Sequence, residues 1–196
     1  METALTRALP WLDPDVSLIC RMAAGDEEAL RALYVAHGRQ LLAYAIRLTG
    51  SPTLAEEVLQ DSLLGAWRGA AGFRGEARVI TWLLGIVHRQ ALNATRRRQQ
   101  PLDSIEQAAE VADHGAGPEA CVEAGERGRA LGAALAELSP EHRAALELVF
   151  YQGLSLAEAA EVCSCPTGTI KSRLSYAKAH LRKALARAGW QAEDMR

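Results

Sequence analysis

The 196-residue sequence has few of the residues that build β-sheets. Aromatic residues make up 5% of it and Ile and Thr are scarce, whereas 49% is hydrophobic, with Ala and Leu dominating. Because aromatic and β-branched side chains favour strands while Ala and Leu favour helices, this balance predicts an all-α fold. The four cysteines lack the spacing of a disulfide framework, which argues against a disulfide-stapled secreted domain.

Long apolar runs and targeting segments are also missing. No stretch approaches the roughly 18 apolar residues of a membrane-spanning helix. The N-terminal segment contains Glu2, Asp13 and Asp15 and no long apolar core, so it does not resemble a signal peptide. We therefore expect a cytoplasmic protein with no membrane insertion of its own.

No grouping of residues is typical of a catalytic or metal site. The histidines form neither a triad nor a zinc pattern: His37, His88, His114, His142 and His180. Cys163 and Cys165 supply only two thiols, which cannot complete a tetrahedral site. Cys163 also continues an apolar stripe, so a buried thiol beside a turn residue is favoured over a redox or metal role. We expect no enzymatic activity, no metal and no cofactor.

The most informative segment is residues 155–188, SLAEAAEVCSCPTGTIKSRLSYAKAHLRKALARA. Ser155 and Glu158 have the spacing of a capping box at the start of a first helix. Pro166 cannot continue that helix, and Thr167 is predicted to cap a second one. The second helix combines an apolar stripe with six basic residues: Lys171, Arg173, Lys178, Arg182, Lys183 and Arg187.

No Asp or Glu lies between residues 167 and 188. A basic helix after a tight turn is typical of a helix-turn-helix that binds DNA. The alternative is an ordinary helical hairpin with a solvated basic face. Such a face usually mixes charges of both signs, so the absence of acidic residues favours DNA binding.

The formal net charge of −2 hides segments of opposite sign. Residues 74–98 carry six Arg against one Glu, whereas residues 99–130 carry seven acidic residues against two Arg. Residues 99–118 also hold two Pro and two Gly and no sustained apolar stripe. This composition predicts a flexible acidic linker.

Apolar stripes at helical spacing predict helices on both sides of this linker. On the N-terminal side we expect helices over residues 15–24 and 26–50, a helix opened by a Thr53–Glu56 capping box, a loop at 70–76, and a helix over 77–98. On the C-terminal side, structure resumes near Glu119, and a helix starts at Ser139-Pro140 and ends at Gly153. The economical architecture is two small helical domains, 15–98 and 119–188, between tails at 1–14 and 189–196.

These segments, in this order, resemble a bacterial RNA polymerase sigma factor of the extracytoplasmic-function (ECF) group of the sigma-70 family. The stretches AEEVLQDSLLGAW and FRGEARVITWLLGIVHRQALNATRRRQ look like the family's region 2, and the helix-turn-helix looks like its region 4. The resemblance implies a non-enzymatic subunit that binds core RNA polymerase and directs initiation at specific promoters. It also implies partners: promoter DNA, the clamp helices of the largest polymerase subunit, the polymerase flap and an anti-sigma factor.

The resemblance assigns binding roles to three sets of residues. An acidic surface that would dock on the clamp helices comprises Glu57, Gln60 and Asp61. Recognition and melting of the minus-ten element would fall to Phe73, Arg74, Glu76, Arg78, Arg89, Arg96, Arg97 and Arg98. Recognition of the minus-thirty-five element would fall to Thr169, Lys171, Ser172, Arg173, Lys178 and Arg182. For Phe73 the alternative is a plug of the small core, and for the acidic surface it is an ordinary solvated face.

Two other functions remain open at this point. In a stand-alone helix-turn-helix regulator, residues 15–98 would sense a signal or dimerise. A helical adaptor without DNA binding would leave the basic helix unexplained. The chain also departs from its relatives, with His88-Arg89 where members often have Arg-Asn and Gln90 where an apolar residue is usual. We therefore expect no direct transfer of a promoter specificity.

Overall fold

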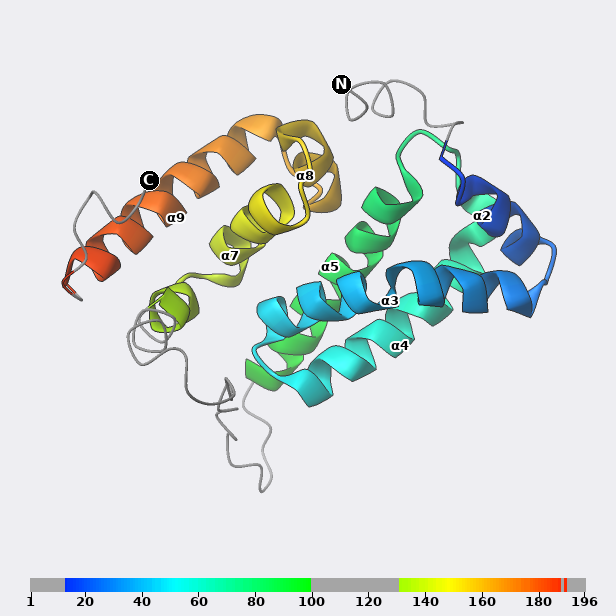
Figure 1. The fold of residues 1–196 in the computed structure, drawn as a ribbon, viewed down its shortest axis with the longest axis horizontal. Helices are drawn as coiled ribbons and strands as arrows, with labels where there is room; N and C mark the ends of the chain where they lie inside the picture. The colour runs from blue at the N-terminus through cyan, green and yellow to red at the C-terminus, as the bar shows by residue number, and fades with distance from the viewer. Residues whose placement is uncertain (1–12, 100–130, 188, 190–196) are drawn as a thin grey trace, which may run out of the picture.

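The computed structural model describes residues 13–99, 131–187 and 189, which are helices and connecting turns without a strand in those ranges. The first unit contains α2 (Val16–Ala23), α3 (Glu27–Thr49), α4 (Pro52–Gly69), the short 3₁₀ helix η2 (Ala70–Gly72) and α5 (Val79–Gln99). In Figure 1, α3 and α4 lie side by side and α5 crosses behind them. Buried Leu41, Tyr44, Val58, Leu83 and Val87 fill the space between these three helices.

Local capping signals set both ends of α3 and the start of α4. The Asp26 carboxylate accepts a hydrogen bond from the Glu28 amide at 3.0 Å and starts α3, which ends at Gly50 with φ of 68°. The predicted Thr53–Glu56 capping box is wrong. Instead Ser51 caps α4, because Pro52 fits the first helical position, where no amide donor is needed.

The start of α5 depends on a distant residue. The helix begins at Val79, two residues later than predicted, and the Val79 amide donates to Oδ2 of Asp13 at 2.8 Å. The predicted loop at 70–76 contains the single turn η2, followed by Gly75 with φ of 70°. Gln99, the first residue of the predicted linker, is instead the last residue of α5. Residues 100–118 and most of both predicted tails lie outside the described residues.

The second unit contains a helical segment at 131–136, α7 (Pro140–Leu146), the π-helical turn η3 (Glu147–Tyr151), α8 (Leu156–Val162) and α9 (Thr167–Arg187). The capping box of Ser155 and Glu158 is confirmed. Thr167 is the first residue of α9 and not the cap that precedes it, which corrects the prediction. The single helix predicted from Ser139 to Gly153 changes from α to π at Glu147.

The two units pack against each other. In Figure 1, α8 lies beside the first half of α5, and α7 lies near the end of α3; both pairs of helices are in contact. A Cβ placed on Gly85 of α5 would lie 3.9 Å from the Cα of Val162 in α8, so the two backbones approach closely. The buried side chains of both units form one continuous cluster. Among the described helices, none has the length and apolar character needed to cross a bilayer.

Candidate nucleic-acid and polymerase interfaces

The acidic residues of α4 lie on its solvent side. Glu57, Gln60 and Asp61 are exposed, while Val58 and Ser62 on the opposite side of the helix are buried. The helical period of 3.6 residues produces this division, because positions 57, 60 and 61 share one face. The structure therefore brings all three predicted polymerase-binding residues together on one surface.

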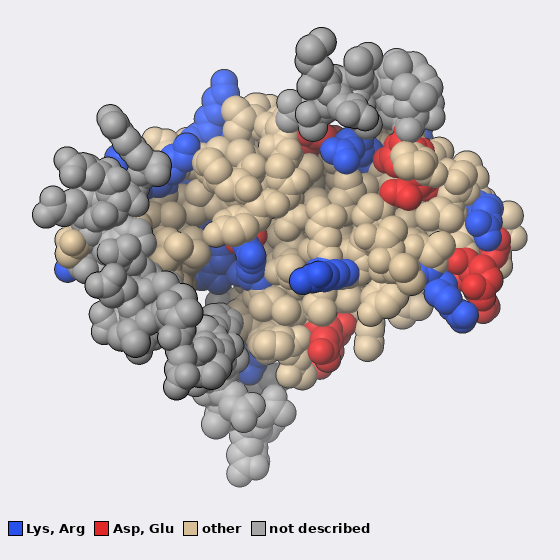
Figure 2. Space-filling view, in the orientation of Figure 1, with Lys and Arg blue, Asp and Glu red and all other residues tan. Residues whose placement is uncertain are grey.

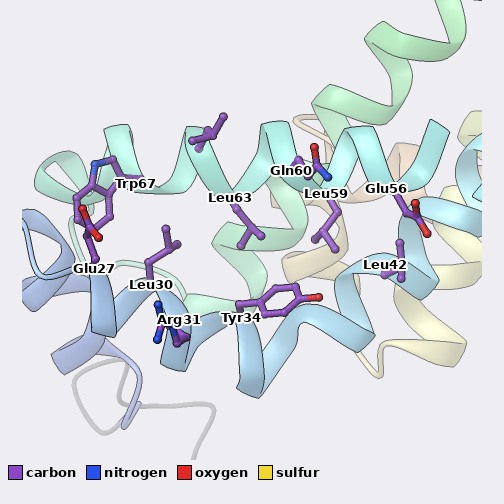
Figure 3. A pocket seen from close by; sticks show the side chains of 11 residues that line it. Glu27, Leu30, Arg31, Tyr34, Leu42, Glu56, Leu59, Gln60, Leu63 and Trp67 are labelled. Carbon is purple, nitrogen blue, oxygen red and sulfur yellow. The ribbon is translucent and has the colours of Figure 1, made fainter. Parts of the chain in front are cut away.

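Beside this surface runs an apolar groove between α3 and α4, with a volume of about 760 Å³. Figure 3 shows Leu30 and Tyr34 of α3 across from Leu63 and Trp67 of α4, with Glu27, Glu56 and Gln60 at the margins. Tyr34 is 49% exposed. Exposed apolar surface in a groove is typical of a docking site.

The sequence analysis did not predict this groove. The available signal was the width of the apolar face of α3. Val35, next to Tyr34, is 79% exposed, so apolar side chains extend further around α3 than one packed face requires.

The loop before α5 holds an aromatic pair. Phe73 is half-buried, and its ring centroid lies 5.1 Å from that of Trp82 with the planes tilted by 54°. Arg74 and Glu76 are exposed on the same loop. Trp82 is thus a further candidate residue, which the sequence analysis did not identify. The tilted rings of Phe73 and Trp82 therefore form an apolar surface beside the exposed charged side chains of Arg74 and Glu76.

The arginines of α5 do not form one cluster. Arg96, Arg97 and Arg98 are exposed in its last turn, and a rise of 1.5 Å per residue places Arg96 about 26 Å from Val79. Arg89 is exposed between the two ends, with Nε donating to the Gly85 carbonyl at 3.3 Å. The basic residues therefore form a track along the helix, away from the Phe73 loop.

Arg78 differs from the other arginines because it faces the second unit. It is half-buried, and its Nη1 lies 4.0 Å from Oε1 of Glu158 at the start of α8. A residue assigned to DNA phosphates thus forms an ion pair between the two units in this structure.

Four of the six predicted reading residues lie on the solvent side of α9, whereas Thr169 and Arg173 lie at the edge of its buried side. Lys171, Ser172, Lys178 and Arg182 are exposed, while Thr169 is half-buried. The opposite side carries the predicted stripe, buried at Ile170, Leu174, Ala177 and Leu185. Figure 2 shows Lys and Arg side chains along the edge of the molecule that α9 forms, with no acidic side chain among them.

Arg173 is only partly accessible. Its guanidinium donates weakly to Sγ of Cys165 at 3.8 Å. The pKa of His88 in α5 is lowered to about 4. Burial is the largest cause, and the positive charge of Arg173 is the next. His88 is 4% exposed, and its Nδ1 lies 2.9 Å from the hydroxyl of Tyr44, so it is a neutral member of a buried hydrogen bond.

Cys163 and Cys165, near the turn between α8 and α9, are not part of a metal-binding cluster among the described residues. Burial raises the pKa of Cys163 to about 12, which keeps it a neutral thiol. Within the part of the chain that the structure describes, no group of three or more His, Cys, Asp or Glu side chains is placed to hold a metal ion.

Family models and known proteins match the chain over both units. The model for Sigma-70 region 2 matches residues 33–100, and the model for Sigma-70, region 4 matches residues 128–181. The ECF RNA polymerase sigma factor SigM of Mycobacterium tuberculosis is 36% identical over 172 residues, covering 87% of this chain and 84% of that protein. SigL of the same species is 35% identical over 170 residues, covering 85% and 94%.

A solved structure has the same fold. The sigma factor RpoE of Bartonella quintana, crystallised with the anti-sigma factor NepR, superposes with a TM-score of 0.59 at 27% identity. The match covers 80% of this chain and 96% of the RpoE chain.

Proposed function

We propose specific roles for the surfaces described above from the premise that this chain belongs to the sigma-70 family, in its ECF group. The family and the all-α fold predicted from the sequence are confirmed. The protein is a sigma factor that binds core RNA polymerase and directs promoter-specific initiation, region 2 reading and melting the minus-ten element and region 4 reading the minus-thirty-five element. We infer that it acts in the cytoplasm and has no catalytic activity of its own.

The polymerase-binding role of α4 rests on one observation, an apolar groove bordered by carboxylates. We propose that Glu57, Gln60 and Asp61 contact basic residues of the clamp helices of the largest subunit. Leu63 and Trp67 in the adjacent groove would receive apolar side chains of the same helices. A helix seated in an apolar groove gains most of its binding free energy there, and the charged rim orients it.

The reading role of α9 rests on its one-signed charge and on the order of its residues. Thr169, Lys171, Ser172 and Arg173 lie in its first two turns. We propose that these turns enter the major groove, where Arg is a frequent bidentate partner of guanine. Lys178 and Arg182 lie further along and would contact backbone phosphates.

The melting role of the Phe73 loop rests on the aromatic pair. We propose that Phe73, supported from behind by Trp82, stacks on an unpaired base of the minus-ten element, while Arg74 and Glu76 hydrogen-bond to it. Arg89 and Arg96–Arg98 would follow the phosphates of the melted strand. From Arg89 to Arg98 the track spans about 13 Å, which suits roughly 4 nucleotides at 3.4 Å each.

Transcription from a promoter library with purified core polymerase tests this proposal. Sequencing the transcripts should reveal one upstream and one downstream element shared by the active promoters. A stand-alone regulator would instead bind duplex operator DNA tightly without polymerase and would leave transcript starts unchanged. The assignment to polymerase is refuted if core polymerase initiates identically with and without this protein.

A further inference from the structure

The contact between the two units contains a charged cluster that helical periodicity alone does not predict. Glu147 of η3 is 3% exposed, and both of its carboxylate oxygens accept hydrogen bonds from Nη1 of Arg47 at 3.0 Å. Glu147 lies inside the apolar run ALELVF, and the π-helical turn directs it toward α3. π-helical turns occur frequently at functional positions.

Arg47 makes two further contacts with the second unit. Its guanidinium carbon lies 4.0 Å from the ring centroid of Tyr151, and its backbone carbonyl accepts a hydrogen bond from Nη1 of Arg143 at 3.3 Å. Gln40 adds a side-chain hydrogen bond of 2.8 Å to Gln152. All these contacts join α3 to the segment from α7 to the residue after η3.

The charge on Glu147 depends on this contact. Burial raises the pKa of the Glu147 carboxyl, and the hydrogen bond and charge of Arg47, followed by the charge of Arg143, oppose the rise. A buried carboxylate without a partner is strongly unfavourable, so separating the units either solvates Glu147 or protonates it. The pair therefore favours one specific arrangement of the two units.

That arrangement is incompatible with reading both promoter elements at once. The helix-turn-helix lies directly against the first unit, because α8 packs on α5 and Oε1 of Glu158 in α8 is 4.0 Å from Nη1 of Arg78. The minus-ten and minus-thirty-five elements are about 25 base pairs apart, or roughly 85 Å at 3.4 Å per pair. The two units must therefore separate before region 2 and region 4 can both reach their elements.

We propose that the Arg47–Glu147 pair, with Arg143 and the Gln40–Gln152 hydrogen bond, is a latch that holds the free protein in a closed state unable to engage a promoter. The closed state also occupies Arg78 through Glu158 and leaves Arg173 only partly accessible. Because the latch lies outside the three proposed binding surfaces, it restrains DNA binding without contributing to it. This inference rests on the proposed reading role of α9.

The test compares three variants by small-angle X-ray scattering and by DNA binding. The DNA is a duplex that carries the upstream element shared by the active promoters of the library, and the protein is free of polymerase. Glu147→Gln removes the charge of the latch. Gly85→Leu inserts a side chain between α5 and α8 without touching the latch, and it replaces a helical glycine with a strong helix former. Glu137→Gln is the matched control, because it neutralises an exposed carboxylate that pairs with His180 in the second unit.

We expect Glu147→Gln and Gly85→Leu to increase the radius of gyration and to bind the duplex roughly 10- to 100-fold more tightly, while Glu137→Gln matches the parent. Such a gain corresponds to an open fraction of about 1–10% in the parent. The latch is refuted if both variants scatter like the parent, or if they open without binding more tightly. Transcription by the parent with core polymerase, measured in parallel, shows whether such a failure extends to the proposed function.

Discussion

Replacement of Phe73 separates a base-stacking role from a purely structural one. Phe73 is half-buried against Trp82, so Phe73→Ala should cost less than the 3–5 kcal/mol lost when a fully buried Phe is removed. The tilted ring pair contributes about 0.5–1.5 kcal/mol, and with partial burial we expect a total near 2 kcal/mol. For a chain of this length, that lowers Tm by roughly 4–8 °C.

The effect on promoter melting should be larger than this stability loss explains. Loss of one base-stacking contact costs about 1–3 kcal/mol, which reduces open-complex formation roughly 5- to 150-fold. Phe73→Leu is the matched control, because it retains an apolar side chain against Trp82 but has no flat ring. We expect Phe73→Leu to recover most of the thermal stability and little of the melting.

Permanganate footprinting of the downstream element, normalised to folded protein, measures the melting, and calorimetry measures Tm. A promoter already mismatched across that element should recover part of the Phe73→Ala loss, because unpairing no longer costs free energy while stacking is still missing. If Phe73→Leu melts promoters as well as the parent, Phe73 is a core residue and the stacking proposal fails.

Three further predictions concern other surfaces. Asp61→Arg combined with Gln60→Ala should weaken binding to core polymerase with little change in Tm, because both residues are exposed; equal competition for core polymerase by parent and variant would show that the α4 surface is misassigned. Arg173→Ala should lose about 1–3 kcal/mol of discrimination at one position of the upstream element, whereas Lys178→Ala should weaken binding to all sequences and reduce its salt dependence. An equal, sequence-independent loss for both would remove Arg173 from base reading. Burial lowers the pKa of His88 from 6.5 to about 4. Between pH 6.5 and about 4, the unfolded chain therefore binds more protons than the native state. Stability should fall as pH drops through this range, by up to roughly 3 kcal/mol, and His88→Gln should flatten the pH dependence of urea denaturation; an unchanged slope would contradict the assignment.

Features encoded within a few residues were predictable from the sequence. The Ser155–Glu158 box and the Asp26 cap depend on groups two or three positions apart, and the structure has both. The start of α4 shows how such reasoning fails. Ser51 and Thr53 are both good caps, and Pro52 decides between them because it occupies the first helical position.

Features made by residues far apart in the chain were not predictable. The acidic surface of α4 and the basic surface of α9 follow from helical period alone and could be assigned in advance. The support of Phe73 by Trp82 and the pairing of Arg47 with Glu147 depend on how helices cross, which periodicity does not specify. Glu147 within an apolar run was the one visible sign of a buried charge, and its partner is 100 residues away.

The hydrogen bond from Val79 to Asp13 affects where this protein can be shortened. Val16, the first residue of α2, is an obvious starting point for a trimmed version. A chain that begins there lacks the carboxylate that accepts from the first amide of α5, and loss of such a cap costs about 1 kcal/mol. The first turn of α5, which carries Trp82 at its edge, would then fray. A trimmed protein intended for promoter-melting assays should therefore keep Asp13, although that residue precedes every described helix.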